Sequence, residues 1–289
     1  MLAVPAGTDV FELARAWFAH AGWDVPPTTG ELTVVTRAGG GRFRGGGGGS
    51  ALAPRLGRLR LTATSALVGP HPHAKAADGL LARDVDLYAL DQQVDDVVVL
   101  GWMTAAARRT GGAVVSADRT AVIAPDPAAA VALTLWSGVA MGPDELVPVV
   151  RPALVGARLG SPQPAGPVPA DGPAPTDGPI GCTLAATFEY DGTVLVTAGR
   201  RDEVPVALAS LTWGLHGPWA YHVSWLPLDL EELDEAQPSR LHVIARSRIA
   251  PVVARAMRAL WSHMGGAVID DGGFLVSTGE LSERSSNLT

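Results

Sequence analysis

Two histidines close to residue 70 have a spacing that could hold a metal ion. In GPHPHAK, residues 69–75, His71 and His73 lie two positions apart, so both imidazoles would point to one side of an extended chain. Two nitrogen ligands do not complete a zinc site, and no cluster of Cys, Asp or Glu with suitable spacing accompanies them. We therefore interpret this stretch as a surface loop, and the sequence predicts neither a metal site nor a cofactor.

A second group of residues with binding chemistry is aromatic. Trp213, Trp219, Tyr221 and Trp225 fall within thirteen positions. In a strand, alternation would place Trp219, Tyr221 and Trp225 on one face of a sheet and His222 on the other. An exposed aromatic face would bind a ligand or a partner protein, whereas a buried one would be an ordinary core.

Carboxylates form the third group. The segment PLDLEELDEAQPSR, residues 227–240, contains Asp229, Glu231, Glu232, Asp234 and Glu235. A solvated acidic turn and a binding loop would both have this composition. Asp270 and Asp271 are also adjacent, but they come directly before Gly272, and Asp-Gly is typical of a hairpin turn rather than of a catalytic pair.

No enzyme motif accompanies these groups. The sequence has no nucleophile elbow, no zinc-protease motif, no CxxC pair and no convincing order of Ser, His and Asp. Because catalytic triads are defined by geometry, an enzyme is kept as the alternative hypothesis. Its site would lie in a cleft between two halves of the chain, with His222, His216 or His71 as the acid or base. A purely structural subunit is the third hypothesis.

Composition and charge exclude several classes of partner. The 289 residues are 47% hydrophobic with a formal charge of −7, which is typical of a folded soluble protein. Residues 159–289 hold 8 basic and 15 acidic side chains, so we expect no nucleic acid partner. The longest nearly uncharged stretch, residues 128–142, is too short to span a membrane. A single cysteine, Cys182, and an N-terminus without a signal-peptide pattern favour a cytoplasmic protein, and the Ala-, Gly- and Pro-rich composition favours a bacterial one.

One short sequence segment occurs twice in the chain in similar form. MGGAVIDDGG, residues 264–273, resembles TGGAVVSADR, residues 110–119, and residues 87–116 and 241–270 share nine identities in thirty positions without a gap. Both stretches contain an apolar stripe with helical spacing that runs into Gly-Gly, where a helix can end in a left-handed residue. The stripe residues are Ile249, Val252, Val253, Ala256, Met257, Leu260 and Met264 in the second stretch and Val98, Val99, Trp102, Met103 and Ala106 in the first.

Strands and hairpins are predicted around this repeat. Extended segments are expected at 31–36, 58–68 and 85–90 in the first half and at 183–190, 193–199, 206–213, 220–226 and 241–245 in the second. Asp191-Gly192 and Asp271-Gly272 each predict a hairpin, the latter with a type I′ turn.

Helices are predicted in two further places. One covers residues 8–22, where Thr8 or Asp9 can cap it, and another covers 143–156. The repeat helix of the second half is expected to have Pro251 in its first turn.

Three segments carry little structural information. Residues 39–50 are mostly glycine and predict a mobile loop, of which GGGGGS at 45–50 has the composition of either a natural loop or an engineered linker. Residues 161–180 contain seven prolines and predict a semi-extended tether. The polar tail at 279–289 is expected to fray.

These patterns together predict an α+β protein of two tandem homologous units, each a mostly antiparallel sheet packed by one long helix. The expected domains are a first unit at 1–158, a Pro-rich linker at 159–181, a second unit at 182–278 and the tail. The preferred functional hypothesis is a non-catalytic binding or scaffold protein whose partner is a protein or a small ligand. The candidate binding residues are Trp213, Trp219, Tyr221, Trp225, His71 and His73.

Overall fold

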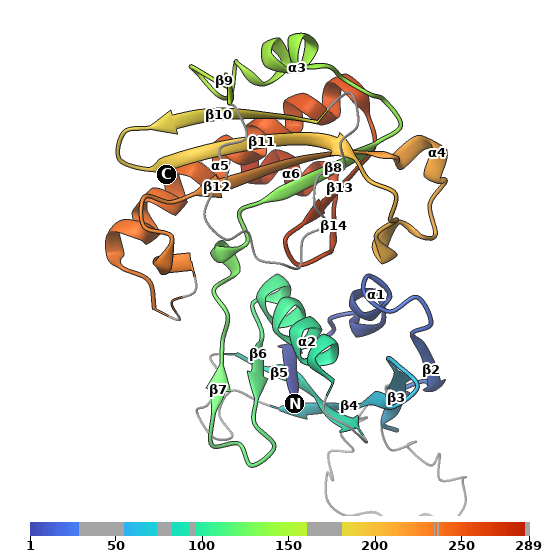
Figure 1. Ribbon diagram of the computed structural model, residues 1–289. Coiled ribbons are helices and arrows are strands. Elements are labelled where there is room, and N and C mark those ends of the chain that lie inside the picture. Colours follow the sequence, from blue (N-terminus) through green and yellow to red (C-terminus); the bar gives the residue numbers. More distant parts are fainter. Residues whose placement is uncertain are drawn as a thin grey trace, which may run out of the picture. The chain divides into compact units, whose positions relative to one another are not determined.

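The computed structural model describes residues 1–28, 55–73, 83–92, 96–160, 181–233, 235 and 237–286 (Figure 1). The predicted strand at 31–36, the glycine run at 39–50 and the proline-rich tether at 161–180 lie outside these residues. The chain divides into two compact units: unit 1 comprises Met1–Ala14 and His20–Pro125, and unit 2 comprises Arg15–Ala19 and Asp126–Thr289. Residues 126–158, which the sequence suggested for the first unit, therefore belong to unit 2.

Unit 1 is a seven-stranded sheet with helices. In chain order its elements are β1 (Leu2–Pro5), α1 (Val10–Arg15), β2 (Gly22–Val25), β3 (Gly57–Arg60), β4 (Ser65–His73), β5 (Val85–Gln92), α2 (Val97–Thr110), β6 (Ala113–Val115) and β7 (Val122–Ile123). The strands lie in the order β2-β3-β4-β5-β1-β6-β7, and each neighbouring pair is antiparallel.

Unit 2 is also a seven-stranded antiparallel sheet with helices. Its elements are β8 (Leu133–Ser137), α3 (Pro143–Val150), β9 (Arg158–Gly160), β10 (Cys182–Phe188), β11 (Gly192–Arg200), α4 (Trp213–His216), β12 (Trp219–Leu226), α5 (Arg240–Met264), β13 (Ala267–Asp270), β14 (Leu275–Val276) and α6 (Thr278–Ser286), with short 3-10 turns at Pro127–Ala129, Val206–Leu208 and Glu231–Leu233. The strand order is β14-β13-β8-β12-β11-β10-β9. The protein is thus of mixed α+β class.

The two sheets share one order of elements. Each described unit runs strand, helix, four strands, long helix and a two-stranded hairpin, and unit 2 has in addition the short helix α4 between β11 and β12 and the helix α6 after the hairpin. In each sheet the first strand lies between the last of the four strands and the hairpin, so β1 lies between β5 and β6 as β8 lies between β12 and β13. The first strand of each unit is therefore an inner strand of its sheet, and its two neighbours are the corresponding strands in both units.

The repeated Gly-Gly sits at the same place in both units. Helix α2 ends at Gly111, whose φ of 63° and ψ of 32° are left-handed. A Cβ on the next residue, Gly112, would lie 2.1 Å from the carbonyl oxygen of Ala3 on β1. In unit 2 a Cβ on Gly266 would lie 2.1 Å from the carbonyl oxygen of Trp136 on β8. Only glycine allows the chain to leave each helix this close to the first strand.

The gapless alignment holds from the start of α2 onward and fails before it. Helix α5 has 25 residues against 14 in α2, and the two end at equivalent positions, so α5 begins eleven residues earlier. Residues 241–245, predicted as a strand, are the first turns of α5, and Pro251 lies in its middle rather than in its first turn. The strand that occupies the place of β5 in unit 2 is β12. The prediction failed because the apolar residues at 241–245 are compatible with either period.

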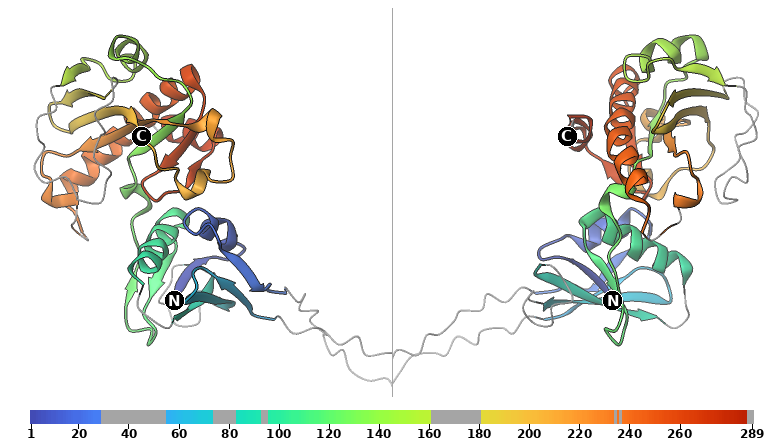
Figure 2. Two further views of the ribbon diagram at one scale, coloured as in Figure 1. Left: turned by 45° about the vertical axis from the view of Figure 1, so that its right-hand side comes forward. Right: turned by 90° about the vertical axis from the view of Figure 1, so that its left-hand side faces the viewer.

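The core of unit 2 lies between its sheet and α5. All seven predicted stripe residues of α5 are buried, and they pack with the inward side chains of β8, β10, β11 and β12. Figure 2 shows α5 along one face of this sheet, with α6 on the far side of α5. In α2, Val99, Trp102, Met103 and Ala106 are buried, but Val98 is exposed, which corrects its predicted place in the stripe.

Several other predicted elements differ in extent. Helices expected at 8–22 and 143–156 are shorter, α1 with Asp9 as its N-terminal cap and α3 with Pro143 as its first residue. Residues 58–68 form a hairpin of β3 and β4 rather than one strand.

Corrections also apply in unit 2. Residues 206–213 form a 3-10 turn and the start of α4 instead of a strand. The Asp271-Gly272 hairpin exists, but positive φ occurs at Gly273 in a longer loop, so the turn is not type I′. The tail does not fray up to residue 286, because Leu281 of α6 is buried against α5.

Replacing Gly112 or Gly266 with alanine should lower the free energy of unfolding by about 1–3 kcal/mol, because the new methyl group meets a backbone oxygen that cannot move alone. Urea unfolding of each variant measures the loss. The control is Gly199→Ala in β11, where a Cβ meets nothing within 4 Å and the change should stay within about 0.5 kcal/mol. Equal effects at Gly199 and Gly266 would contradict the close-approach explanation.

Candidate functional site

The aromatic residues of β12 belong largely to the core. Tyr221 and Trp225 are buried against the α5 side of the sheet, and Trp219 packs partly buried beside them. The Tyr221 hydroxyl donates to the carbonyl of Val139 at 2.9 Å and accepts from the amide of Met141 at 2.8 Å. Burial raises the pKa of Tyr221 to about 12. The aromatic rings of Tyr221 and Trp225 are therefore buried in the core and are not exposed to a partner, which corrects the hypothesis that these two residues form a binding surface.

The opposite face of β12 carries His222. Its Nδ1 lies 3.0 Å from the Thr134 hydroxyl on the neighbouring strand β8. Burial, with a smaller contribution from the positive Arg201, lowers the pKa of His222 below its ordinary value. His216 lies in α4, and the structure does not describe the side chain of Trp213.

His71 and His73 lie at the end of β4, paired with Leu87 and Val85 of β5. This corrects the expected surface loop, because the chain stays extended through both histidines. Among the described residues, no group of three or more His, Cys, Asp and Glu side chains could hold a metal ion. The histidine pair therefore lies on a paired strand of unit 1.

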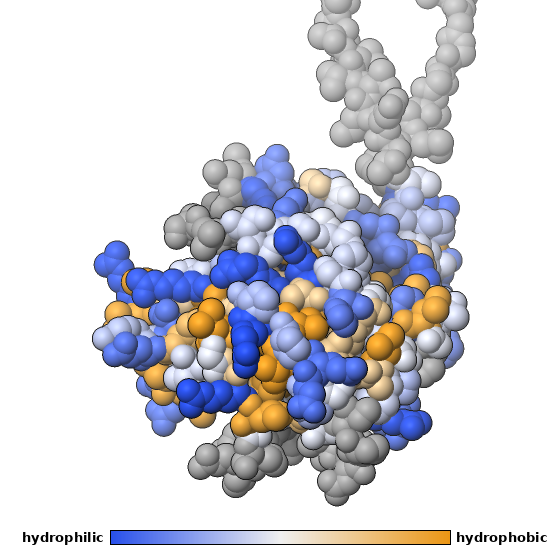
Figure 3. Space-filling view, turned by 90° about the horizontal axis from the view of Figure 1, so that it is seen from above, coloured by the Kyte–Doolittle hydropathy of each residue, from blue (hydrophilic) through white to orange (hydrophobic). Residues whose placement is uncertain are grey.

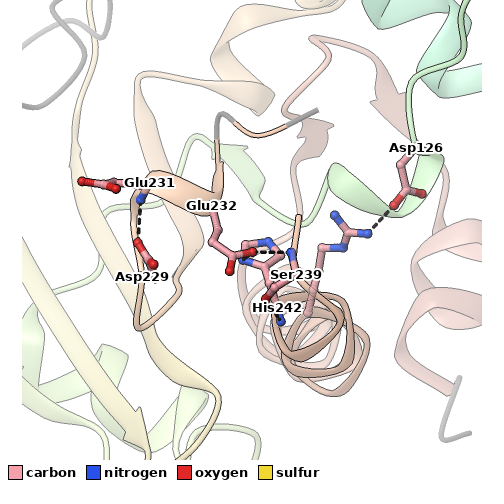
Figure 4. A network of polar contacts seen from close by, with 7 residues as sticks. Asp126, Asp229, Glu231, Glu232, Ser239 and His242 are labelled. Atoms are coloured by element: carbon pink, nitrogen blue, oxygen red, sulfur yellow. Dashed lines mark hydrogen bonds and ion pairs between the residues drawn. The ribbon is translucent and has the colours of Figure 1, made fainter. Parts of the chain in front are cut away.

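A different cluster of polar residues lies where α5 begins (Figure 4). Ser239 caps the helix, its hydroxyl accepting from the amide of His242 at 3.2 Å. Glu232, on the preceding 3-10 turn, accepts from the amide of Ser239 at 2.6 Å, and the same oxygen lies 3.9 Å from Nδ1 of His242. The carboxylate of Glu232 thus ties the turn at 231–233 to the first turn of α5.

His242 is buried at the centre of this cluster. Its ring lies 5.0 Å from that of Trp225, at a tilt of 55°. Burial and the charge of Arg246 lower the pKa of His242 below 6.5, although Glu232 opposes them. Hydrogen bonds from Ser239 lower the pKa of Glu232 as well, so this carboxylate stays ionised near neutral pH.

One turn further along α5, the buried guanidinium of Arg246 pairs with Asp126. Asp126 also accepts from the amide of Ala128 and so caps the 3-10 turn at 127–129. The start of α5 is therefore fixed on one side by the turn at 231–233 and on the other by the first residues of unit 2 after Pro125.

The outer surface of this region is aliphatic. Six side chains between 228 and 244 are 40–78% exposed, and we call them the aliphatic patch: Leu228, Leu230, Leu233, Leu241, Val243 and Ile244. Carboxylates alternate with them at Asp229, Glu231 and Glu235, all exposed. The patch spans the segment that leads into the 3-10 turn, the turn itself and the start of α5, and the contact between Glu232 and Ser239 joins the turn to the helix.

Exposed aliphatic residues also occur elsewhere on unit 2. Val204, Val206, Leu211 and Leu215 are 37–66% exposed, and Val155 and Leu159 are exposed after α3. Seen from above, orange residues are interrupted by blue ones over the face that carries α3 and β9 in Figure 1 (Figure 3). Exposed aliphatic side chains are usual singly on soluble proteins, whereas several together are typical of interaction surfaces.

Comparison with known protein families, with curated proteins and with solved structures found no match to this chain. No helix among the described residues has the length and apolar character needed to cross a membrane.

The aliphatic patch and His242 were missed from the sequence. The available signal was the spacing of leucines within LDLEEL, residues 228–233, which interrupts an otherwise polar segment. The carboxylates of this segment were the predicted feature, and residues 241–245 at the start of α5 were predicted as a strand.

Replacing Trp225 with alanine should cost about 3–5 kcal/mol of stability, the usual loss for a buried aromatic side chain. The same replacement at Tyr190, which is 73% exposed in the β10–β11 loop, should change stability by about 0.5 kcal/mol or less. Thermal and urea unfolding compare the two. A small loss at Trp225 would show that its side chain is available on the surface after all.

Acidification should loosen the start of α5. Because the folded protein holds the pKa of His242 below 6.5, the unfolded segment binds the proton more tightly; the stability from neutral His242 is complete above pH 6.5 and is lost as the pH falls below it. The protection factor of the Val243 amide, its exchange rate relative to that of an unstructured chain at the same pH, reports this opening because the amide bonds to the Ser239 carbonyl. His242→Gln should remove the pH dependence of this protection factor, whereas His222→Gln should leave it. An equal protection factor at neutral and mildly acidic pH in the natural protein would contradict the assignment.

Proposed function

We propose that the protein is a non-catalytic binding protein, built from a duplicated α+β unit, whose unit 2 binds a partner through the aliphatic patch. The observation that carries this proposal is the difference between the two units at the start of their long helices. Unit 2 has residues 227–250 where unit 1 connects β5 to α2 through residues 93–96. The additional segment carries all six residues of the patch.

Support for the duplication comes from the shared order of elements and from the two Gly-Gly pairs. Gly112 and Gly266 approach the first strand of their own sheets at corresponding register positions, since Ala113 pairs with Ala3 and Ala267 pairs with Trp136. Equivalent glycines at equivalent contacts are expected when one sequence has been copied.

The additional segment is not required by the common architecture. Unit 1 has the same strand order with a helix that begins eleven residues later, so this architecture forms without the additional turns, although Ala245 and Ile249 of those turns pack into the core of unit 2. Exposed aliphatic side chains reduce solubility and give nothing to the core. A partner that covers them accounts for their presence, because loops added to a common scaffold usually carry function.

The polar groups of the region have a supporting role in this proposal. Glu232, Ser239 and His242 bond to one another and to the helix start, and Arg246 is paired with Asp126. These contacts fix the backbone that presents the patch, so a partner would meet a preformed surface and lose less ordering entropy on binding.

Site-specific photocrosslinking in the source cells tests this proposal. A photoreactive amino acid at Leu230 or Leu241 should yield one discrete adduct common to both positions, because both side chains face the same partner. The control position is Val155, which is 79% exposed against 78% for Leu241 and lies outside the patch. It should give no such adduct.

Introducing Ile244→Ser beside the photoreactive residue should abolish the adduct, since this change removes apolar area without disturbing the core. If neither patch position gives a discrete adduct, or if Val155 gives the same one, the patch is not a binding surface and the proposal is wrong.

A further inference from the structure

We infer that the partner presents a basic amphipathic helix whose apolar face covers the aliphatic patch. This inference rests on the proposed function and adds the chemistry of the partner. It follows from two features of the patch: the charge of its surroundings and the secondary structure that carries it.

The charge around the patch is negative. Asp229, Glu231, Glu232 and Glu235 lie among or beside the aliphatic residues, and the exposed basic side chain of the segment is Arg240. The next two arginines along α5 are already matched, Arg246 by Asp126 and Arg248 by Asp191. An apolar surface with an acidic rim is complementary to an apolar surface with a basic rim, and this complementarity steers association and rejects acidic partners.

The secondary structure of the patch determines how a partner can bind. Leu233 lies on the 3-10 turn, Leu241, Val243 and Ile244 lie on the first turns of α5, and Leu228 and Leu230 precede the turn. None of the described residues between 227 and 244 lies in a strand, so this part of the patch offers no strand edge to which an extended peptide could add by main-chain hydrogen bonds. Recognition has to occur between side chains, and a helix presents aliphatic side chains at i, i+3 and i+4 for this purpose.

A second copy of the chain and an anionic membrane fit this surface poorly. Two copies joined through the patch would bring Glu231 and Glu235 of one chain close to those of the other, and like charges across an interface are unfavourable. Anionic lipids would be repelled by the same carboxylates.

Peptide binding to the full chain tests the inference. The probe is a fluorescent peptide of about five helical turns with leucine on one face and lysine on the other. One comparison peptide has glutamate in place of lysine, and a second has serine in place of leucine. Fluorescence anisotropy should show at least tenfold tighter binding of the leucine–lysine peptide than of either comparison, and its affinity should fall as salt is added.

Matched variants locate the binding. Leu241→Ser with Ile244→Ser should weaken the leucine–lysine peptide at least tenfold, and Glu231→Gln with Glu235→Gln should weaken it and reduce its salt dependence. The controls, Val155→Ser and Glu203→Gln, alter exposed residues elsewhere on unit 2 and should leave binding unchanged. Far-ultraviolet circular dichroism checks that each variant is folded.

Failures of the two proposals are distinguishable. If the leucine–glutamate peptide binds equally well, or if the Leu241 and Ile244 changes have no effect on the leucine–lysine peptide, the inference about a basic helix is wrong. A crosslinked partner at Leu241 that binds through an acidic or extended segment would overturn it too, yet would leave the binding function standing. Absence of both peptide binding and crosslinks would overturn both.

Discussion

The close approach between the end of each long helix and the first strand of its sheet is the constraint on which the fold depends. Gly112 and Gly266 bring the chain against the carbonyl oxygens of Ala3 and Trp136, closer than any side chain would allow. This contact fixes where the helix stops, and it places the following hairpin in register beside the first strand. The helix is therefore seated on the sheet at one defined point, and its apolar stripe must meet the inward side chains of the central strands.

Unit 2 builds on this arrangement by lengthening the helix at its other end. Because α5 is anchored at Gly266, the eleven additional residues can only extend away from the hairpin, beyond the range that α2 occupies in unit 1. The extension is held by polar contacts of Glu232, Ser239, His242 and Arg246 rather than by core packing alone. The result is a rigid helix start with an apolar outer surface.

The aromatic side chains of β12 contribute both to the core of unit 2 and to the start of α5. Tyr221 and Trp225 are buried in the core, and the indole of Trp225 also packs against the ring of His242. Trp225 also donates to the carbonyl of Asp191 at 2.6 Å, and Asp191 pairs with Arg248 of α5. The aromatic strand therefore supports the start of α5.

Local pattern was sufficient for part of this picture. Four features were predictable because each depends on spacing within a few residues or on a single backbone preference. They are the helical stripe ending at Met264, the Gly-Gly stops, the hairpins at 191–192 and 271–272 and the mixed α+β class.

Tertiary contacts determined the rest. Residues 241–245 are apolar enough for a strand or a helix, and they are helical because Ser239 and Glu232 cap them and because β12 already fills the place next to β8. The tail forms a helix because Leu281 is buried against α5, and the polar composition of the tail does not predict this contact.

Similarly, alternation placed Tyr221 and Trp225 on one face of the sheet, but only the position of α5 made that face the core and left the leucines of 228–244 exposed. Which of two apolar faces is covered depends on residues distant in the sequence, and this physical dependence explains why the sequence left the burial of Tyr221 and Trp225 open.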